Sequence, residues 1–511
     1  FTAQWCTITG YGSINVRINK VTLRLLAIGA IALLLAVSLA NLFNQSKDPF
    51  KPKRGKLSPT SIAGYYNQNF NWLDCYGGFK CATYKVPIDY QNIDLGEFDI
   101  AVMKHEAPNA IGNLVVNPGG PGGSGIDYAY SYADAFTAAI NQNFNIVGFD
   151  PRGVGRSAPI DCLTNKETDE AYASSAYPEN EAELAKMQAD TKKFADNCQA
   201  ENKYLAFYST ANAARDMDIL RQLLGDAKLN FLGKSYGTYL GTLYAKNFPD
   251  KVGRFVLDGA VDPTLNSGED TIQQAIGFDS AFGAFAKDCM KESSCPLSGD
   301  YSTQIQSKLH DVRMNPIVVG NRKLTESLAV YGIAFGLYDK EFGWPILKSA
   351  LTDFFNGNGK SLLSLADQYN RRDANGNYTS NDASSLTVIS CADFPPVIVD
   401  ENLIKSKAPI FGKYVANADL NCKYLPKPKY ELIKEPINLN SQVVVIGTSN
   451  DPATPYQWAV KLSQVLVNSV LITINGEGHT GYNRNDPCVD QAVEKYLISG
   501  VIPAQNLVCS A

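Results

Sequence analysis

Short apolar runs recur along the chain, separated by glycine, proline, asparagine and aspartate. Two lie at residues 113–117 and 145–150, and a third at 229–233 leads into a segment with helical spacing. Runs this short and this apolar are typical of parallel strands that are buried on both faces. Amphipathic segments such as 213–224 lie between them. Strands that alternate with helices predict an α/β fold with a mostly parallel sheet.

The alternation fades over residues 262–421, where helical stretches rich in aromatic side chains replace it. These stretches lie at 278–290, 328–337 and 344–355. Alternation returns with apolar runs at 442–447 and 469–474. The pattern therefore predicts an α/β core in two parts, residues 60–261 and 422–511, with a largely helical cap inserted between them.

The composition of the chain is that of a large globular protein. Its 511 residues are 45% hydrophobic and 11% aromatic, which is enough for an extensive core and two structural units. The net charge is −5, with acidic and basic residues mixed throughout. Because the chain has no basic stripe, we expect no nucleic-acid partner.

Residues 1–43 have the pattern of an export signal. Three basic residues, Arg17, Lys20 and Arg24, precede an uncharged run at 25–43, which contains a small-x-small cleavage pattern. Residues 44–59 are polar and basic and fit a tether. We expect a secreted or envelope-associated protein. It contacts a membrane only if the apolar segment is retained as an anchor, and the sequence leaves open whether that segment is cleaved.

Cysteine usage agrees with export to an oxidising compartment. Of the eleven cysteines, only Cys6 precedes the apolar run, and an even number follows it. Ten cysteines in an exported chain predict disulfides, and pairing neighbours in order gives five short loops, although the sequence does not fix the connectivity. A metal site is the competing interpretation. The chain has no Cys-x-x-Cys spacing and three histidines, so we expect no metal and no other cofactor.

The third apolar run ends in Gly-Lys-Ser-Tyr-Gly at 233–237, with a helical segment behind it. This is the Gly-x-Ser-x-Gly pattern of a sharp strand-to-helix turn that exposes a serine. The flanking glycines suit such a turn, because side chains there would collide with the neighbouring strand and helix. Ser235 is therefore the candidate nucleophile.

A serine hydroxyl needs a base, and the sequence offers three histidines. We expect the base to be His479, which lies in a glycine-rich loop after an apolar run, rather than His105 or His310. The imidazole in turn needs a carboxylate. Asp451, after the run at 442–447, gives the order serine, aspartate, histidine of α/β hydrolases. Asp258 is the alternative acid.

Attack on a carbonyl creates an oxyanion that backbone N–H groups must stabilise. Residues 117–125 contain a glycine-rich loop that follows a strand, as the corresponding loops of esterases do. We expect one donor at Gly119 or Gly120 and the second at Tyr236, the residue after the nucleophile.

Five segments together resemble the secreted tripeptidyl aminopeptidase group, serine exopeptidases and esterases related to proline iminopeptidase. The segments are 117–125, 149–157, 233–237, 450–455 and 478–480. The resemblance extends over nearly all of residues 60–511. It implies an α/β-hydrolase fold with a helical cap above the serine, and removal of dipeptides or tripeptides from free N-termini. Members also hydrolyse esters, so a carboxylesterase or lipase-like hydrolase with the same triad is the alternative.

An aminopeptidase must recognise a free α-amine, most directly with a carboxylate near the cleft. The resemblance favours Asp393, in a Cys-x-Asp segment. Glu269 and Asp270, at the start of the predicted cap, are further candidates. The expected partners are therefore peptides with free N-termini. A non-catalytic protein on a hydrolase scaffold would have lost a triad member, and all three types are present.

Overall fold

The structure is a computed structural model that describes residues 49–50, 59–427, 433–484 and 486–510. The chain divides into two compact units, Phe1–Lys51 and Pro52–Ala511, and the helices and strands described all lie in the second. The predicted export segment at 25–43 and most of the predicted tether lie outside the described residues. Across the part that is described, no helix has the length and apolar character needed to cross a membrane.

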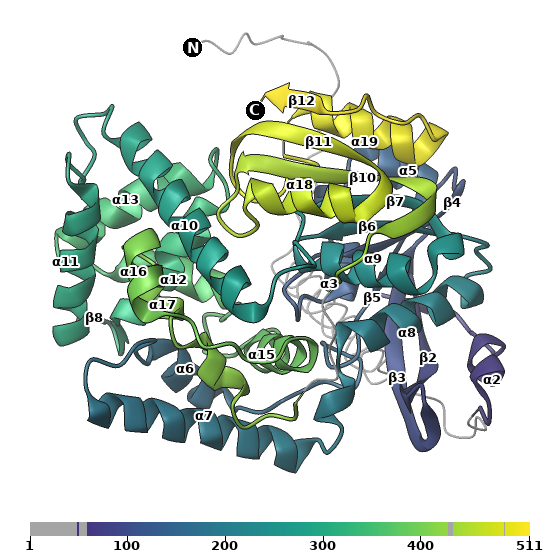
Figure 1. Ribbon diagram of the computed structural model, residues 1–511, viewed down its shortest axis with the longest axis horizontal. Coiled ribbons are helices and arrows are strands. Elements are labelled where there is room, and N and C mark those ends of the chain that lie inside the picture. The colour runs from purple at the N-terminus through teal and green to yellow at the C-terminus, as the bar shows by residue number, and fades with distance from the viewer. Residues whose placement is uncertain (1–48, 51–58, 428–432, 485, 511) are drawn as a thin grey trace, which may run out of the picture. The chain divides into compact units, whose positions relative to one another are not determined.

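A ten-stranded sheet organises the second unit, counted over the described residues (Figure 1). Its order is β1-β2-β3-β5-β4-β6-β7-β10-β11-β12. The first three pairings are antiparallel and the next six are parallel. The strands are β1 (Leu73–Cys75), β2 (Phe79–Asp89), β3 (Asn92–His105), β4 (Gly112–Asn117), β5 (Phe144–Phe149), β6 (Leu229–Lys234), β7 (Val252–Asp258), β10 (Ile437–Asn450), β11 (Leu466–Glu477) and β12 (Leu507–Ser510). The predicted α/β-hydrolase fold with a mostly parallel sheet is confirmed.

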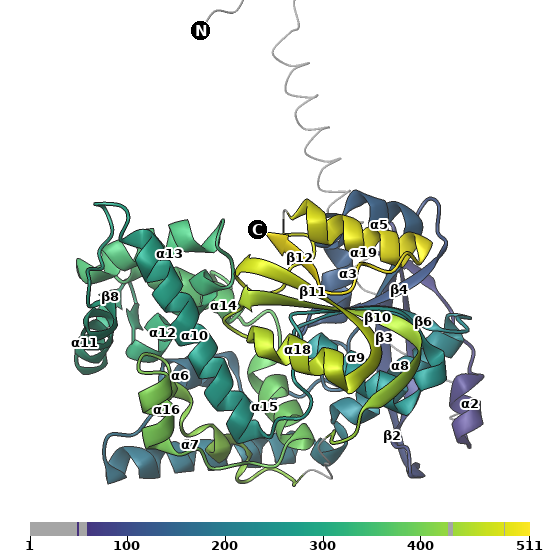
Figure 2. The ribbon, with the colours of Figure 1, turned by 45° about the horizontal axis from the view of Figure 1, so that its top comes forward.

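Both faces of the sheet are covered by helices, as the unbroken apolar runs predicted. Leu114 and Val116 of β4 pack on one face, in a core shared with α3 (Gly125–Tyr130), α5 (Ala138–Asn143) and α19 (Pro487–Ser499). Val115 points to the other face and packs with α8 (Thr210–Leu223), α9 (Tyr236–Asn247) and α18 (Tyr456–Val465). Figure 2 shows these two layers on either side of the strands.

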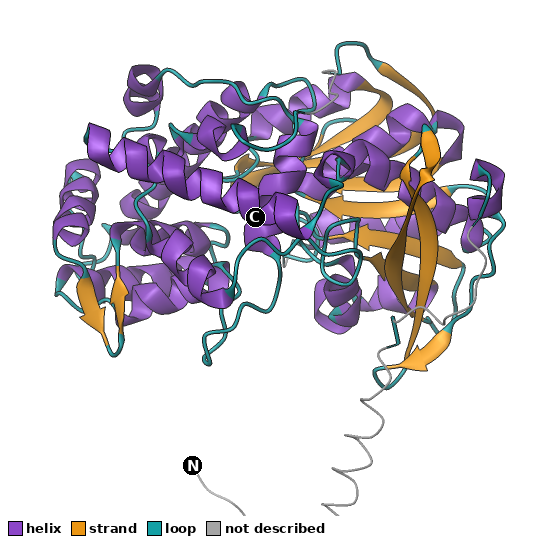
Figure 3. Ribbon diagram, turned by 90° about the horizontal axis from the view of Figure 1, so that it is seen from below, coloured by secondary structure: helices purple, strands orange, loops and turns teal. Residues whose placement is uncertain are grey.

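The segment between β7 and β10 is largely helical and has its own hydrophobic core, which includes Phe282, Phe285, Leu347 and Phe354. Its elements are α10 (Ser267–Cys289), α11 (Tyr301–Met314), β8 (Ile317–Val319), β9 (Arg322–Leu324), α12 (Glu326–Leu337), α13 (Gly343–Phe355), α14 (Lys360–Tyr369), α15 (Asp382–Asp393), α16 (Glu401–Lys407) and α17 (Gly412–Val415). Figure 3 shows these helices gathered beside the sheet, with the short β8–β9 pair among them. This segment is called the cap below.

Two helices from the first part of the chain also lie with the cap. They are α6 (Asn165–Ala173) and α7 (Glu181–Glu201), which follow β5. Tyr172 and Ala173 pack against the hydrophobic core of the cap. The amphipathic pattern of such a segment indicates that one side is buried, but not which part of the protein covers that side. The sequence analysis therefore assigned these residues to the α/β core.

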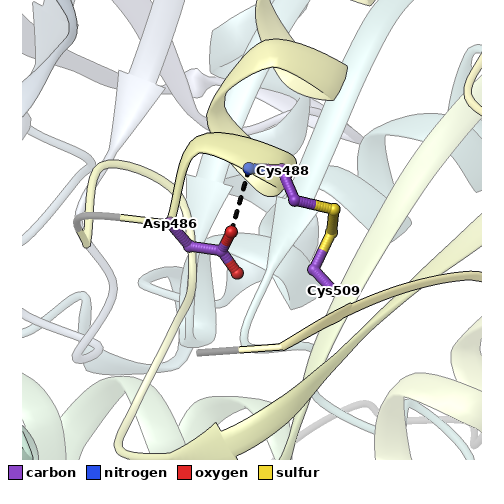
Figure 4. Close-up of side chains that lie close together, drawn as sticks. All are labelled: Asp486, Cys488 and Cys509. Carbon is purple, nitrogen blue, oxygen red and sulfur yellow. Dashed lines mark hydrogen bonds between the residues drawn. A yellow bond between two sulfur atoms is a disulfide. The ribbon is translucent and has the colours of Figure 1, made fainter.

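The ten cysteines after the apolar run form five disulfides, which confirms the predicted disulfide framework. The pairs follow chain order: Cys75–Cys81, Cys162–Cys198, Cys289–Cys295, Cys391–Cys422 and Cys488–Cys509. The carboxylate of Asp486 lies beside the last pair and accepts a hydrogen bond from the Cys488 N–H at 2.9 Å, which caps α19 (Figure 4). Both sulfurs of this cluster are bonded to each other, so neither is a thiolate ligand for a metal.

Candidate active site

Ser235 stands at the tight turn between β6 and α9. Its backbone angles are φ 54° and ψ −127°, a strained conformation for a residue with a side chain. The flanking glycines permit the turn. A Cβ on Gly233 would lie 2.5 Å from the Gly237 carbonyl oxygen, and a Cβ on Gly237 would lie 2.9 Å from the Asn117 carbonyl oxygen. The Ser235 N–H donates to the Asp258 carbonyl at 2.8 Å, which fixes the turn against β7.

The structure brings Asp451 and His479 together at the ends of two neighbouring strands. Nδ1 of His479 lies 2.9 Å from each carboxylate oxygen of Asp451. The N–H groups of Ala453 and Thr454 both donate to Asp451 Oδ1 at 2.9 Å, so the carboxylate is held in place. Both side chains are buried. An aspartate in this position fixes the tautomer of the imidazole and stabilises its charged form.

The carboxylate of Asp258, the alternative acid, binds backbone N–H groups of the histidine loop instead of the imidazole. The N–H groups of Gly481 and Tyr482 donate to its two oxygens at 2.8 and 2.9 Å. Burial raises the pKa of Asp258 and lowers that of the neighbouring Lys234 to about 8. The ammonium of Lys234 lies 3.9 Å from Asp258 and donates to the Tyr482 carbonyl at 2.8 Å. These contacts anchor the loop that carries His479.

The end of β7 also brings the histidine towards the serine. A Cβ on Gly259 would lie 3.2 Å from Cε1 of His479, and the residue before it accepts the Ser235 N–H. The other two histidines lie elsewhere. His105 ends β3 and stacks on Tyr132, while His310 is a half-exposed residue of α11.

Two residues that the sequence analysis did not single out contact the Asp451–His479 pair. Thr454 donates to Asp451 Oδ2 at 3.0 Å, and its hydroxyl lies 3.3 Å from His479 Nδ1. The backbone carbonyl of Tyr338, the residue after α12, accepts the backbone N–H of His479 at 2.9 Å. The Tyr338 ring meets the imidazole edge-on, with ring centroids 5.2 Å apart. Thr454 belongs to the recognised 450–455 segment. Tyr338 comes from the cap and has no local sequence signal.

The glycine-rich loop after β4 lies against the serine turn. A Cβ on Gly119 would lie 2.9 Å from the Ser235 Cβ and 3.3 Å from the Tyr236 nitrogen. The Gly119 N–H is already used, because it donates to the Asn117 side chain at 3.0 Å. Gly120, in contrast, lines the same cavity as Ser235 and Tyr236. Of the two glycines expected as donors, the geometry favours Gly120.

A cavity of about 330 Å³ lies between the serine turn and the cap, and Ser235, Tyr236, Asp270 and Asp393 all line it. The buried carboxylate of Asp393 accepts hydrogen bonds from the Thr210 N–H at 2.7 Å and its hydroxyl at 2.5 Å. Burial nevertheless raises the pKa of Asp393 to about 7. Burial and the nearby Asp262 likewise raise the pKa of Asp270 to about 7.

The structure does not bring Glu269 to this cavity, so its prediction as an amine ligand is corrected. Glu269 is exposed, and its carboxylate accepts the Asn266 N–H at 3.1 Å in the capping box that begins α10. Of these two neighbouring acids, it is Asp270 that lines the cavity. At the first turn of a helix, adjacent residues point in different directions, and a pattern of two acids does not distinguish them.

The Asp-Pro-Arg-Gly turn after β5 supports the core. Arg152 is fully buried, and its guanidinium makes two bonds to Asp216 of α8 at 2.6 and 2.7 Å. It also donates to the Pro87 and Ile88 carbonyls of β2 at 3.1 and 3.0 Å. The turn therefore ties β2 and α8 together without touching the cavity.

The fold, the strained serine and the Asp–His pair define a serine hydrolase of the α/β-hydrolase class. The model of the family described as "TAP-like protein" matches residues 408–509. The chain is 35% identical over 463 residues to serine protease Hip1 of Mycobacterium tuberculosis, covering 85% of this chain and 88% of that protein. The chain therefore belongs to the TAP-like group of serine hydrolases.

Two further relatives carry different activities in their names. Carboxylesterase B of Mycobacterium tuberculosis is 36% identical over 453 residues, covering 84% of this chain and 86% of that protein. Tripeptidyl aminopeptidase of Streptomyces lividans is 28% identical over 474 residues, covering 86% of each. The names of these two relatives agree on hydrolysis and differ on the bond that is cleaved.

Proposed function

We propose that this protein is an exported serine exopeptidase that removes dipeptides or tripeptides from free peptide N-termini. The observation that carries the proposal is the cavity in which Asp270 and Asp393 lie with Ser235. A buried carboxylate, Asp393, and a half-buried one, Asp270, in the cavity of the nucleophile suit a substrate that brings a positive charge there. The name of the Streptomyces relative, tripeptidyl aminopeptidase, supports the same activity.

In the proposed mechanism Ser235 attacks the substrate carbonyl while Nε2 of His479 takes the hydroxyl proton. Asp451 stabilises the imidazolium through Nδ1. The N–H groups of Gly120 and Tyr236 stabilise the oxyanion. His479 then gives its proton to the leaving amine, and an acyl-enzyme remains on Ser235. A water molecule, activated by the same histidine, releases the short peptide and restores the serine.

The α-ammonium group of the substrate pairs with Asp393 or Asp270 in this proposal. Burial disfavours the ionised form of these carboxylates. The ammonium group of a bound substrate favours that form, because it places a positive charge next to them. The distance from the carboxylates to Ser235 then limits how many residues fit before the cleaved bond. A blocked N-terminus has no charge to offer and fills part of that space.

Export is part of the same proposal. Five disulfides in the described residues suit an oxidising compartment, and the basic and apolar pattern of residues 17–43 suits a secretion signal.

A carboxylesterase is the second candidate, and a specific feature favours it. The cavity wall also carries apolar side chains, among them Val261, Phe394, Val397 and Trp458. Such a wall accommodates an acyl chain without requiring an amine. The name of the relative carboxylesterase B supports the same activity.

Three substrates separate the candidates on the purified protein: Ala-Ala-Ala-arylamide, its N-acetylated form and a short-chain aryl ester. The exopeptidase proposal expects the free tripeptide to be cleaved far faster than the acetylated one. Equal rates for these two would remove it and leave the esterase. Ser235→Ala should abolish all turnover with the fold intact, and retained activity would refute the mechanism.

A further inference from the structure

A second cavity, of about 520 Å³, adjoins the catalytic histidine and has no part in the proposal above. His479 lines it, together with residues 338–342, which join α12 to α13 in the cap, and Trp344 and Pro345 at the start of α13. Ser235 lines the first cavity and is not among the residues that line the second. The proposed nucleophile and base therefore face different spaces.

The chemistry of the proposed reaction gives each space a role. The residues before the cleaved bond stay attached to Ser235 as the acyl group, so they occupy the first cavity. The leaving nitrogen receives its proton from His479 and must depart on the side of the histidine. We propose that the second cavity binds the leaving part of the peptide, the residues that follow the cleaved bond. This inference rests on the proposed exopeptidase function.

Several polar atoms around the second cavity lack partners. Trp344 Nε1, Thr448 Oγ1, Thr480 Oγ1 and Asp486 Oδ2 are buried without a hydrogen-bond partner among the described residues, and all four side chains belong to the lining. In Figure 4 only one of the two Asp486 oxygens carries a dashed line. Unpartnered buried groups are costly, at about 1–3 kcal/mol each. A peptide backbone in the cavity offers both donors and acceptors to these side chains once they turn towards it.

The charge of the second cavity indicates which leaving chains it prefers. Six carboxylates and three basic side chains line it, apart from His479. Two of the bases are paired, Arg484 with Asp339 and Lys348 with Glu292, each at 2.5 Å. The lining is thus acidic in balance. It favours leaving chains that carry lysine or arginine over those that carry glutamate.

Phe342 provides an apolar contact on the same wall. It lines the cavity, and its side chain is exposed although it is large and aromatic (65%). Ile346, one turn further along α13, is also exposed (52%) but does not line the cavity. The two residues form a matched pair for testing the site.

The test compares substrates that share the acyl part Ala-Ala-Ala: the arylamide and two hexapeptides, continuing with Lys-Ala-Lys or Glu-Ala-Glu. The wild type should have a lower KM for the lysine hexapeptide than for the glutamate one, with a difference that shrinks at high salt. Phe342→Ala should raise the KM for the lysine hexapeptide about five-fold and leave arylamide cleavage unchanged. Ile346→Ala should alter neither.

The arylamide reports on the proposed function alone, because its leaving group is too small to fill the second cavity. If the wild type cleaves neither the arylamide nor the hexapeptides, both proposals fall. If it cleaves the arylamide, two results overturn the leaving-chain site alone. One is an equal KM for the two hexapeptides, and the other is a Phe342→Ala effect that is absent or the same for all substrates.

Discussion

Burial has raised the pKa values of individual acidic residues that line the same cavity as Ser235. The pKa of Asp393 is raised to about 7, whereas an aspartate in an unfolded chain titrates near 4. Between these values the folded protein holds a proton that the unfolded chain has released. The contribution of Asp393 to the free energy of unfolding therefore falls as the pH rises from about 4 to about 7.

The pH dependence of substrate binding follows from the same group. For an unblocked tripeptide arylamide, KM should fall as the pH rises through about 7, because Asp393 and Asp270 become ionised and pair with the α-ammonium. Asp393→Asn should raise this KM roughly ten- to a hundred-fold, the worth of a charged hydrogen bond. The aryl ester, which has no amine, is the control. A KM that shifts equally for both substrates would rule out amine recognition by Asp393.

Replacing Asp451 should have a larger effect on catalysis than replacing Asp393, because Asp451 contacts His479 directly. Asp451→Asn places an amide opposite Nδ1 and favours the wrong tautomer, so kcat should fall by about a thousand- to ten-thousand-fold. The KM should change little, and the circular dichroism spectrum should match the wild type. A loss smaller than ten-fold would mean that another carboxylate supports the histidine.

At the scale of elements, the turns after the strands do most of the positioning. The serine turn follows β6, the acid loop follows β10, and the histidine loop follows β11. These ends lie at one edge because β6, β7, β10 and β11 follow one another as parallel strands in the sheet. The motifs at 233–237, 450–455 and 478–480 were recognisable for this reason, since each is local and each turn restricts its residue types.

Arg152 gives a test of how one such turn supports the core. Replacing it with methionine leaves Asp216 as a buried carboxylate without its guanidinium, which should lower the free energy of unfolding by about 3–5 kcal/mol. Lys192→Met in α7 is the matched control, because its ion pair with Asp196 is exposed and should matter by less than about 1 kcal/mol. Denaturant unfolding measures both. Equal effects would contradict the structural role of Arg152.

At the scale of the whole molecule, the candidate site needs the core and the cap together. The core supplies the serine, the acid and the histidine, whereas α10 and α15 of the cap supply Asp270 and Asp393. The Tyr338 carbonyl of the cap also binds the backbone of the histidine loop. The disulfides connect parts of this arrangement, and Cys391 and Cys422 both line the first cavity.

The disulfides should differ in how much they stabilise the molecule. Cys162–Cys198 closes a loop with a sequence separation of 36, and Cys75–Cys81 one of 6. Loop-closure entropy predicts losses of about 3.8 and about 2.2 kcal/mol when each pair is replaced by serines. Thermal unfolding of the two double variants should show the larger decrease in Tm for the first. The reverse order would mean that native packing outweighs chain entropy.

The sequence by itself determined the features that depend on neighbouring residues. It predicted the strands of the sheet, the helices between them and the Gly-x-Ser-x-Gly turn, because periodicity and local sterics act over short distances. The even number of cysteines after the apolar run predicted disulfides. Only the tertiary structure decided which acid meets His479, that the Gly119 N–H donates to the Asn117 side chain, that Asp270 rather than Glu269 reaches the cavity, and that α6 packs against the cap. Apart from the Gly119 hydrogen bond, each depends on contacts between segments far apart in the chain. For the serine turn, local sequence fixes the strain at Ser235, and the cap determines the space that Ser235 faces.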